Sequence, residues 1–416
     1  MRNSGFLWIV VALMFLLDLY VFQALKIVLP VASPRWRMTI VIAYWLIAIL
    51  AIVVVATLPY LRYETWPRAM RTYVLAIIIG LFLGKLVASL FFIVDDIRRG
   101  GLWAFSKLFN SNVDVISQEG ITRSVFLSWM GLTIGAGLFT TLLFGFLNKY
   151  RYQINRLHLA FENLPNSFRG LKIVHISDIH SGSFTDKEAV RRGVNKIIAE
   201  QPDLILFTGD LVNDRATEMQ DYIEIFSQLK APLGVYSVLG NHDYGDYVRW
   251  ENEEAKHSNL RDLMSVHDKM GWRLLMNEHA VIEKDGEKIA LIGIENWGAK
   301  GRFSRYGKME KAYPGSENYP FKILLSHDPS HWDAQVRTEY RDIDLMLAGH
   351  THGMQFGLEL PGIKWSPVQY MYKQWAGLYE FENQKLYVNR GFGFLGYPGR
   401  VGILPEITVI ELQIPV

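Results

Sequence analysis

The chain has 416 residues and a formal net charge of +2, half of its residues are hydrophobic, and it contains no cysteine. This length is typical of two or three domains, and the apolar content is too high for a disordered chain. The lack of cysteine excludes disulfides, thiolate metal sites and a cysteine nucleophile. The near-neutral charge argues against a nucleic-acid partner, whose binding would favour a basic domain.

Charge is unevenly distributed along the chain. Residues 1–150 carry 13 basic and 6 acidic side chains, a net charge of +7, whereas the remaining residues carry a net charge of −5. All 11 histidines lie after residue 150. The sequence therefore predicts two domains, with residues 1–150 suited to lipid and residues 151–416 carrying the titratable chemistry.

The first domain contains four long apolar runs, at Gly5–Leu29, Met38–Leu61, Tyr73–Val94 and Val125–Leu147. Each is long enough to cross a hydrocarbon core about 30 Å thick, which takes ~20 helical residues. The alternative, helices buried in a soluble bundle, needs polar faces at helical period, and residues 40–58 have almost none. We therefore predict an N-terminal all-α bundle of four transmembrane helices in contact with the lipid bilayer.

An even number of spans places the N-terminus and the second domain on the same side of the membrane. Seven basic residues flank the spans on each side, so the positive-inside rule is balanced. The predicted third loop, about residues 95–123, is long and counts less in that rule, which leans the second domain toward the cytoplasm. Within the spans, Asp18 and Lys85 either pair with each other inside the bundle or line a lipid or ion pathway.

The second domain begins with a βαβαβ pattern. Strands are predicted at Leu171–Ser177, Asp203–Thr208 and Gly234–Leu239, with helices at Lys187–Glu200 and near Met219–Leu229. Further strands are predicted at Ala280–Glu283, Ile289–Ile294, Ile323–Ser326, Leu345–Ala348, Gly377–Phe381, Leu386–Val388 and Glu406–Leu412. This end of the chain has the pattern of a β-rich meander. The element pattern of the second domain favours a layered α/β sandwich over an all-parallel, doubly wound sheet.

Five polar clusters each follow a predicted strand: Asp178–His180, Gly209–Asp210, Gly240–Asp243, Ser326–Asp328 and Gly349–His352. Ligands of α/β sheets bind in the crevice outside the carboxyl ends of the strands, so these clusters are expected to meet there. Their carboxylate, imidazole and amide groups suit Mn, Fe, Zn or Co better than an all-oxygen calcium site.

The spacing inside the clusters has a physical reason. In an extended Asp-x-His or His-x-His segment, the first and third side chains point to the same face and can converge on one centre or on two adjacent centres. A glycine precedes Asp210, Asn241 and His350, and we expect each of these glycines to let the chain turn tightly at its strand end.

In this order, the five clusters resemble the pattern Asp-x-His, Gly-Asp, Gly-Asn-His-Asp/Glu, His and Gly-His-x-His of the calcineurin-like metallophosphoesterase superfamily, over about residues 165–416. The tail, with Gly391, Arg400 and Pro405–Ile407, resembles the membrane-anchored bacterial branch, which implies a location in the bacterial inner (cytoplasmic) membrane. Some members of the superfamily cleave UDP-2,3-diacylglucosamine. Met354 departs from the glycine that relatives often have, which bears on substrate fit rather than on metal binding.

The resemblance implies two divalent metal ions, of Mn, Fe or Zn. The first ion would be held by Asp178, His180 and His352, the second by Asn241, His327 and His350, and Asp210 would bridge both.

The resemblance also implies two catalytic residues. His242 would reach the phosphoryl group or the leaving oxygen without binding metal, and Asp243 would orient His242. Two such metals would clamp the attacking and leaving oxygens and supply a metal-bound hydroxide near neutral pH. The implied enzyme is a metal-dependent phosphoric ester hydrolase, acting on a phosphodiester or pyrophosphate.

The substrate class is left open by the sequence. Residues 354–379 are rich in Trp and Tyr, with Lys364 and Lys373 between them. They form either an aromatic core loop or an interfacial lip that admits a lipid phosphate. A soluble nucleotide is a further possibility. A different class of function would be a transporter or sensor whose helices carry the activity and whose phosphoesterase domain is regulatory.

Overall fold

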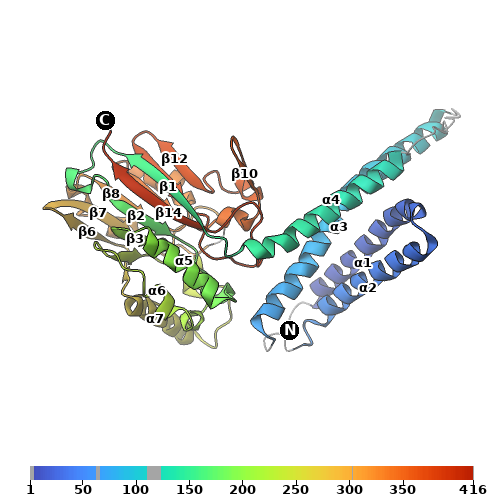
Figure 1. Cartoon of the computed structure of the whole chain (residues 1–416), viewed down its shortest axis with the longest axis horizontal. Helices are drawn as coiled ribbons and strands as arrows, with labels where there is room; N and C mark the ends of the chain where they lie inside the picture. The colour runs from blue at the N-terminus through green and yellow to red at the C-terminus, as the bar shows by residue number, and fades with distance from the viewer. Residues whose placement is uncertain (1–3, 62–65, 110–122, 302, 416) are drawn as a thin grey trace. The chain divides into compact units, whose positions relative to one another are not determined.

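The computed structural model describes residues 4–61, 66–109, 123–301 and 303–415 (Figure 1). The chain divides into two compact units, Met1–Phe144 and Gly145–Val416, which are described in turn.

The first unit is entirely helical. Its long helices are α1 (Ser4–Val28), α2 (Pro34–Thr57), α3 (Arg68–Phe109) and α4 (Arg123–Gly145). Within the described residues, four helices are long and apolar enough to cross a membrane, and each contains most of one predicted apolar run. The prediction of an all-α membrane domain is therefore confirmed.

Helix α3 differs from its prediction. It has 42 residues, about 60 Å at 1.5 Å per residue, which is twice the hydrocarbon thickness. It continues as helix through residues 95–109, where a loop was predicted, and residues 110–122 of that loop lie outside the described part of the chain. Asp95 pairs with Arg98 at 2.7 Å, an i,i+3 contact that supports helix in this polar stretch despite Gly100 and Gly101.

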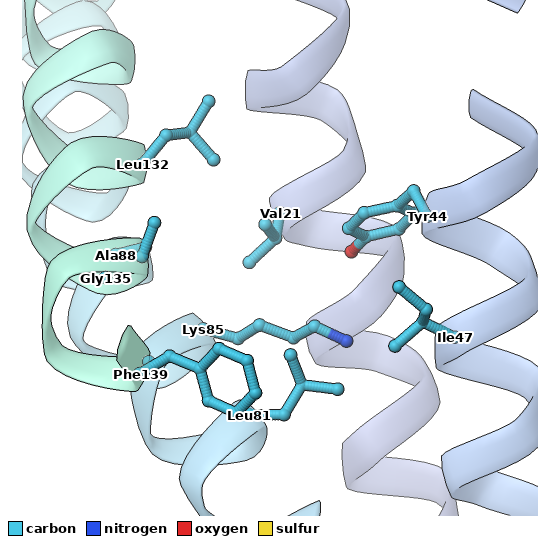
Figure 2. Close-up of a pocket in the computed structure, with 11 residues that line it drawn as sticks. Val21, Tyr44, Ile47, Leu81, Lys85, Ala88, Leu132, Gly135 and Phe139 are labelled. Atoms are coloured by element: carbon cyan, nitrogen blue, oxygen red, sulfur yellow. The ribbon is translucent and has the colours of Figure 1, made fainter. Parts of the chain in front are cut away.

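The two charged residues inside the spans pair with each other. The Lys85 ammonium contacts the Asp18 carboxylate, and the Tyr44 hydroxyl donates to the Asp18 main-chain oxygen at 2.7 Å. A pocket of about 200 Å³ lies beside this pair and is lined mainly by apolar side chains. Figure 2 shows the Lys85 side chain reaching across it toward Tyr44 and Ile47.

The second unit contains two six-stranded sheets within its described residues. The first has the order β1-β14-β2-β3-β4-β5. Its strands are β1 (Gln153–Ala160), β14 (Glu406–Gln413), β2 (Lys172–Ile176), β3 (Leu204–Phe207), β4 (Val235–Ser237) and β5 (Arg273–Leu274).

The second sheet has the order β12-β13-β9-β8-β7-β6. Its strands are β12 (Gly377–Phe381), β13 (Gln384–Val388), β9 (Leu345–Ala348), β8 (Lys322–Leu325), β7 (Glu287–Gly293) and β6 (Glu278–Lys284). A separate antiparallel hairpin is formed by β10 (Leu358–Leu360) and β11 (Ile363–Trp365).

The second sheet is not the meander that was predicted. Only β6–β7 and β12–β13 are antiparallel hairpins, whereas β7–β8, β8–β9 and β9–β13 are parallel. The strands between these hairpins are buried on both faces, as parallel strands are, so their near-continuous apolar runs do not reveal strand direction.

The two sheets stack face to face, with further layers outside them. Figure 1 shows α5 (Lys187–Ala199), α6 (Ile223–Phe226) and α7 (Glu253–Met270) along one side of the first sheet, where they share an apolar core with β2 and β3. A second core fills the space between the sheets, and a third packs the short helix α8 (Met309–Ala312) and Trp332 on the outer face of the second sheet. The predicted layered α/β sandwich is therefore confirmed.

Candidate metal centre

The structure brings all five predicted clusters to one place, at the carboxyl ends of five strands. Strands β2, β3 and β4 supply three clusters from the first sheet, and β8 and β9 supply two from the second. Since these strands are parallel within each sheet, their ends meet at one edge of the sandwich. The fold therefore positions polar side chains from residues 178 to 352 in a single centre.

The first group of side chains in this centre comprises Asp178, His180 and His352, all buried, with one ligand atom of each within 4.8 Å of the others. His352 Nε2 lies 3.2 Å from Asp178 Oδ1, and His180 Nε2 lies 4.0 Å from the same oxygen. An imidazole nitrogen pair facing one carboxylate oxygen is an arrangement that suits a divalent transition metal.

The second group comprises Asp210, His327 and His350. His350 Nδ1 lies 2.8 Å from Asn241 Oδ1 and 3.3 Å from His327 Nε2. Two ring nitrogens and an amide oxygen therefore face one point. These are again nitrogen and oxygen ligands of the kind that Mn, Fe and Zn accept.

Asp210 lies between the two groups. Its Oδ2 is 3.5 Å from His180 Nε2 in the first group and 3.2 Å from His327 Nε2 in the second. One carboxylate oxygen thus faces ring nitrogens of both groups, which is the position that a bridging ligand requires.

The donor set fits metal ions better than it fits a hydrogen-bonded polar core. His180 is fully buried, and neither of its ring nitrogens has a hydrogen-bond partner among the described residues. A buried imidazole without partners is costly unless something else occupies its lone pair.

Outer partners fix two of the histidine rings. His327 Nδ1 lies 2.7 Å from the Thr208 main-chain oxygen, so it carries the proton and leaves Nε2 free to bind. His350 Nε2 lies 3.0 Å from the Tyr372 hydroxyl, on the far side of the ring from Asn241. These contacts orient both rings toward the candidate metal position.

Burial and charge act in opposite directions on the histidines. Burial lowers the pKa of His180 to about 3, so its imidazole is neutral and able to bind a metal. Burial also opposes the charged form of His327, but the Asp210 carboxylate outweighs it and raises the pKa of His327 to about 10, so an ion binding at Nε2 would have to displace a proton from that atom. The Asp210 carboxyl, although buried, is held ionised by the surrounding imidazoles, chiefly His327.

The ligands do not converge through extended backbone, as was predicted. Asp178, His180, Asp210, His350 and His352 all adopt left-handed backbone conformations, with φ between 48° and 70°. Such conformations cost about 1–3 kcal/mol each in non-glycine residues and cluster at functional sites. The side chains at i and i+2 still converge, but they do so because the chain coils sharply at each strand end.

The glycines before the ligands act in two different ways. Gly209 has a φ of +95° and provides the tight turn that was predicted. Gly240 and Gly349 do not adopt positive φ, but a Cβ on Gly349 would lie 1.9 Å from the Ser177 hydroxyl oxygen and one on Gly240 would lie 2.3 Å from Asp210 Oδ1. These two glycines are needed for close approach of the strand ends rather than for turning.

The Asp243 carboxylate contacts main-chain N–H groups and not the His242 ring that it was expected to orient. The carboxylate accepts four main-chain N–H groups, from Gly240, Asp210, Leu211 and Val212, at 2.8–3.2 Å. It therefore clamps the loop that carries Asp210 instead of orienting a histidine ring. Burial, followed by the Asp210 charge, raises the pKa of Asp243 to about 7.

The His242 ring is oriented by another residue. The ring Nδ1 lies 2.7 Å from the main-chain oxygen of Asn213, while the main-chain N–H of His242 donates to Asp210 Oδ1 at 2.8 Å. The ring packs edge-on against His180, with 5.0 Å between centroids. His242 thus borders the first group with Nε2 directed away from its anchoring carbonyl.

Sequence reasoning did not predict the contacts that three supporting residues make with the centre. Asn213 acts through its main chain, and no side-chain pattern signals that. Tyr372 belongs to the aromatic stretch that was noted, but its contact with His350 depends on how the chain folds back. Arg400 is fully buried, contacts His352 Nδ1 at 3.3 Å and donates to the main-chain oxygen of Arg390 at 2.7 Å. A lone arginine in a glycine-rich segment gives little indication of such burial.

Comparison with known proteins agrees with this geometry. Residues 1–149 match a family model described as a probable calcineurin-like phosphoesterase transmembrane domain, and residues 171–354 match calcineurin-like phosphoesterase. The chain is 32% identical over 259 residues to the uncharacterized metallophosphoesterase YkuE of Bacillus subtilis, covering 60% of this chain and 82% of that protein. It is 29% identical over 297 residues to the phosphodiesterase YaeI of Escherichia coli, covering 70% of this chain and 99% of that protein.

A vertebrate protein is similar as well. The chain is 33% identical over 266 residues to a transmembrane protein with metallophosphoesterase domain from Danio rerio, covering 62% of this chain and 56% of that protein. The similarity thus spans little more than half the length of that relative. Taken with the order of the clusters, these matches show that the chain is a membrane-associated hydrolase that belongs to the calcineurin-like metallophosphoesterase family.

Proposed function

We propose that the protein is a membrane-anchored dinuclear phosphoesterase that hydrolyses a phosphodiester or pyrophosphate carried by a lipid. In this proposal residues 1–150 form the membrane domain and residues 151–416 the catalytic domain. The observation that supports two ions is the placement of Asp210 Oδ2 between His180 and His327.

The proposed ligands are those that the two groups contain. One ion would be held by Asp178, His180 and His352, the other by Asn241, His327 and His350, with Asp210 shared between them. When bound, Mn, Fe or Zn ions would supply Lewis-acid activation of the phosphoryl group and of a water nucleophile.

The chain's own catalytic contribution would come from His242. Its Nδ1 is fixed by the Asn213 carbonyl, so Nε2 is the ring atom that can face a substrate. From there it would donate a proton to the leaving oxygen or stabilise charge on the phosphoryl oxygens. Asp243 would act indirectly, by holding the loop that carries Asp210.

The relatives and the anchoring both support the proposed substrate class. One relative is named a phosphodiesterase, which favours a diester. The four candidate spans keep the catalytic unit at a bilayer surface, where lipid-linked esters are concentrated. A soluble nucleotide substrate would need no such anchoring.

The test combines metal analysis with turnover. Purified full-length protein in mild detergent is expected to contain about two transition-metal ions per chain and to hydrolyse bis(p-nitrophenyl) phosphate until a chelator is added. Asp210→Asn is expected to lose both the ions and the turnover while the protein remains folded. Asp285→Asn, in the exposed turn between β6 and β7, is the matched control and should change neither. Near-normal turnover in Asp210→Asn would contradict the dinuclear assignment.

We also propose that the membrane is the bacterial inner membrane and that the catalytic domain faces the cytoplasm. The predicted third loop, about residues 95–123, is long, so its basic residues count less in the positive-inside rule. The remaining basic residues then favour the cytoplasm for the side that carries the catalytic domain. Because the chain has no cysteine, Glu283→Cys gives a single label on the catalytic unit. An impermeant maleimide is expected to label it in broken cells but not in intact cells. Equal labelling in both would place the domain outside.

A further inference from the structure

The β10–β11 hairpin has one face made entirely of apolar side chains. Leu358 pairs with Trp365 and Leu360 pairs with Ile363 across the hairpin. Since side chains alternate between the two faces of a strand, these four share one face, and Glu359 and Lys364 form the other. The four apolar side chains are 38–55% exposed.

Two polar contacts hold the opposite face of the hairpin against the protein. Glu359 accepts a bidentate pair of hydrogen bonds from Arg390, at 2.6 and 2.9 Å, and Arg390 is itself paired with the buried Glu406 at 2.6 Å. The Lys364 ammonium turns inward, contacts the Ala376 main-chain oxygen and lies 4.7 Å from the Trp375 ring centroid. Specific polar contacts of Glu359 and Lys364 therefore hold the hairpin in an orientation that leaves its apolar face outward.

Both ends of the hairpin are tied to the candidate metal centre. Ser366, just after β11, donates to the main-chain oxygen of Gly353, the neighbour of the proposed ligand His352. Further on, Tyr372 contacts the His350 ring at 3.0 Å. The exposed Met354 precedes the hairpin on the other side. The hairpin is thus joined at both ends to segments that carry proposed ligands or contact them.

Residues 354–379 contain the hairpin and were expected to form either an aromatic core loop or an exposed lip. In the structure, some of their aromatic side chains are buried and others are exposed. Tyr372 and Trp375 are buried and belong to a small core with Val368. Tyr370 and Met371 are 78% and 58% exposed and extend the apolar surface beyond Trp365. An exposed apolar surface of this kind marks an interaction site, because a water-facing surface would favour polar side chains.

The occupant that fits this surface is a lipid bilayer. The chain is membrane-associated, and its last candidate span ends at Asn148. Asn148 donates to the main-chain oxygen of Arg400, and Val401 forms a bridge with Phe356, two residues before the hairpin. The chain that leaves the span is therefore attached to the part of the catalytic unit from which the hairpin projects.

We propose that the β10–β11 hairpin inserts its apolar face into the bilayer interface beside the metal centre. Trp365 and Tyr370 are the residue types that favour the headgroup level, and the four-residue apolar face is suited to shallow burial. The hairpin would bring the mouth of the centre against lipid headgroups. Insertion itself does not require hydrolysis, whereas entry of a lipid-linked substrate from the bilayer rests on the proposed function.

The test uses the cysteine-free chain. Full-length Leu360→Cys protein is labelled with an environment-sensitive fluorophore and reconstituted in vesicles of phosphatidylcholine and phosphatidylglycerol. Ile198→Cys, an exposed apolar position on α5, is the matched control. Quenching is measured with aqueous iodide and with spin-labelled lipid, and metal content is compared with that of the unmodified chain to verify folding.

The Leu360 label is expected to be quenched by the lipid quencher and to lose iodide quenching several-fold relative to the Ile198 label. Ile363→Cys should behave like Leu360→Cys, and it replaces Leu360→Cys as the labelling site if that variant does not fold. Iodide quenching equal to that of the control would overturn the proposal. Protection from both quenchers would also overturn it, since a second copy or a protein partner would then cover the face. Because turnover is not the readout, failure of insertion is distinguishable from failure of the proposed chemistry.

Discussion

The clamp formed by Asp243 leads to a sharp expectation for Asp243→Asn. Each carboxylate oxygen accepts two main-chain N–H groups, so the four bonds are divided equally between the oxygens. An asparagine keeps one oxygen and places an NH₂ group against two N–H donors. Two bonds to a charged acceptor are lost, at about 1.5–3 kcal/mol each, for a total of about 3–6 kcal/mol.

That loss is large compared with the stability of a typical domain, about 5–15 kcal/mol. It should lower the melting temperature of the catalytic unit by on the order of 10 °C or more, and it should reduce metal content because the loop of Asp210 is released. The assay is thermal unfolding of the full-length protein in detergent at pH 8, where Asp243, with a pKa of about 7, is ionised.

The matched control is Asp214→Asn in the same loop region. Asp214 Oδ1 is buried without a hydrogen-bond partner in the described structure, so the same substitution removes no bond there. Its melting temperature should stay within about 2 °C of the unmodified protein, as for substitutions that break no buried network. If Asp243→Asn unfolded at the unmodified temperature and lost only turnover, the clamp would be refuted, and a role in orienting His242 would be restored.

Three further outcomes are expected. His242→Ala should retain both metal ions but lower steady-state turnover about 10²-fold or more, and loss of an ion would show that it is a ligand. Burial lowers the pKa of His267 to about 3, so below about pH 6.5, its ordinary pKa in the unfolded chain, this one histidine should destabilise the folded protein, contributing about 2 kcal/mol at pH 5. Urea unfolding at pH 5 and 8 should show that this difference shrinks in His267→Gln, which retains a partner for Ser237. Lys85→Met leaves Asp18 unpaired inside the membrane unit, with a cost of up to about 3–5 kcal/mol. The double variant with Asp18→Asn should melt above the single variant in detergent, and equal melting would show that the pair carries no stability.

The sequence predicts element positions in this protein better than it predicts connections. Apolar runs bounded by polar clusters locate most of the strands that position the centre, because strands β3, β8 and β9 are buried on both faces. It does not predict that the edge strand β1 pairs in parallel with β14 from the far end of the chain. Such pairing depends on which partner remains available once the sheet has formed, and no local pattern records it.

The centre shows the same division between residue identity and geometry. The order of the clusters predicts which side chains meet, since parallel strands end at one edge. The left-handed backbone at Asp178 and His180 could not be predicted, because few non-glycine residues adopt it, even though Asp and His are enriched among those that do. It is maintained by the surroundings: the Asp178 N–H donates to the Gly209 oxygen at 2.9 Å, and the His180 N–H donates to the Asp210 oxygen at 3.0 Å. Local preference is overridden by hydrogen bonds between strand ends that are distant in sequence.

The hairpin and the spans expose apolar surface for different physical reasons, and this explains why the sequence reveals one and only hints at the other. A span needs about 20 apolar residues in a row, which is a strong signal in any window. The β10 and β11 strands have three residues each, and every second side chain is polar. Their apolar face exists only because the hairpin pairing is in register and because Arg390 fixes the polar face inward. Changing Arg390 should therefore disturb the proposed contact of the hairpin with the membrane without altering a single apolar residue, a consequence that composition alone would not indicate.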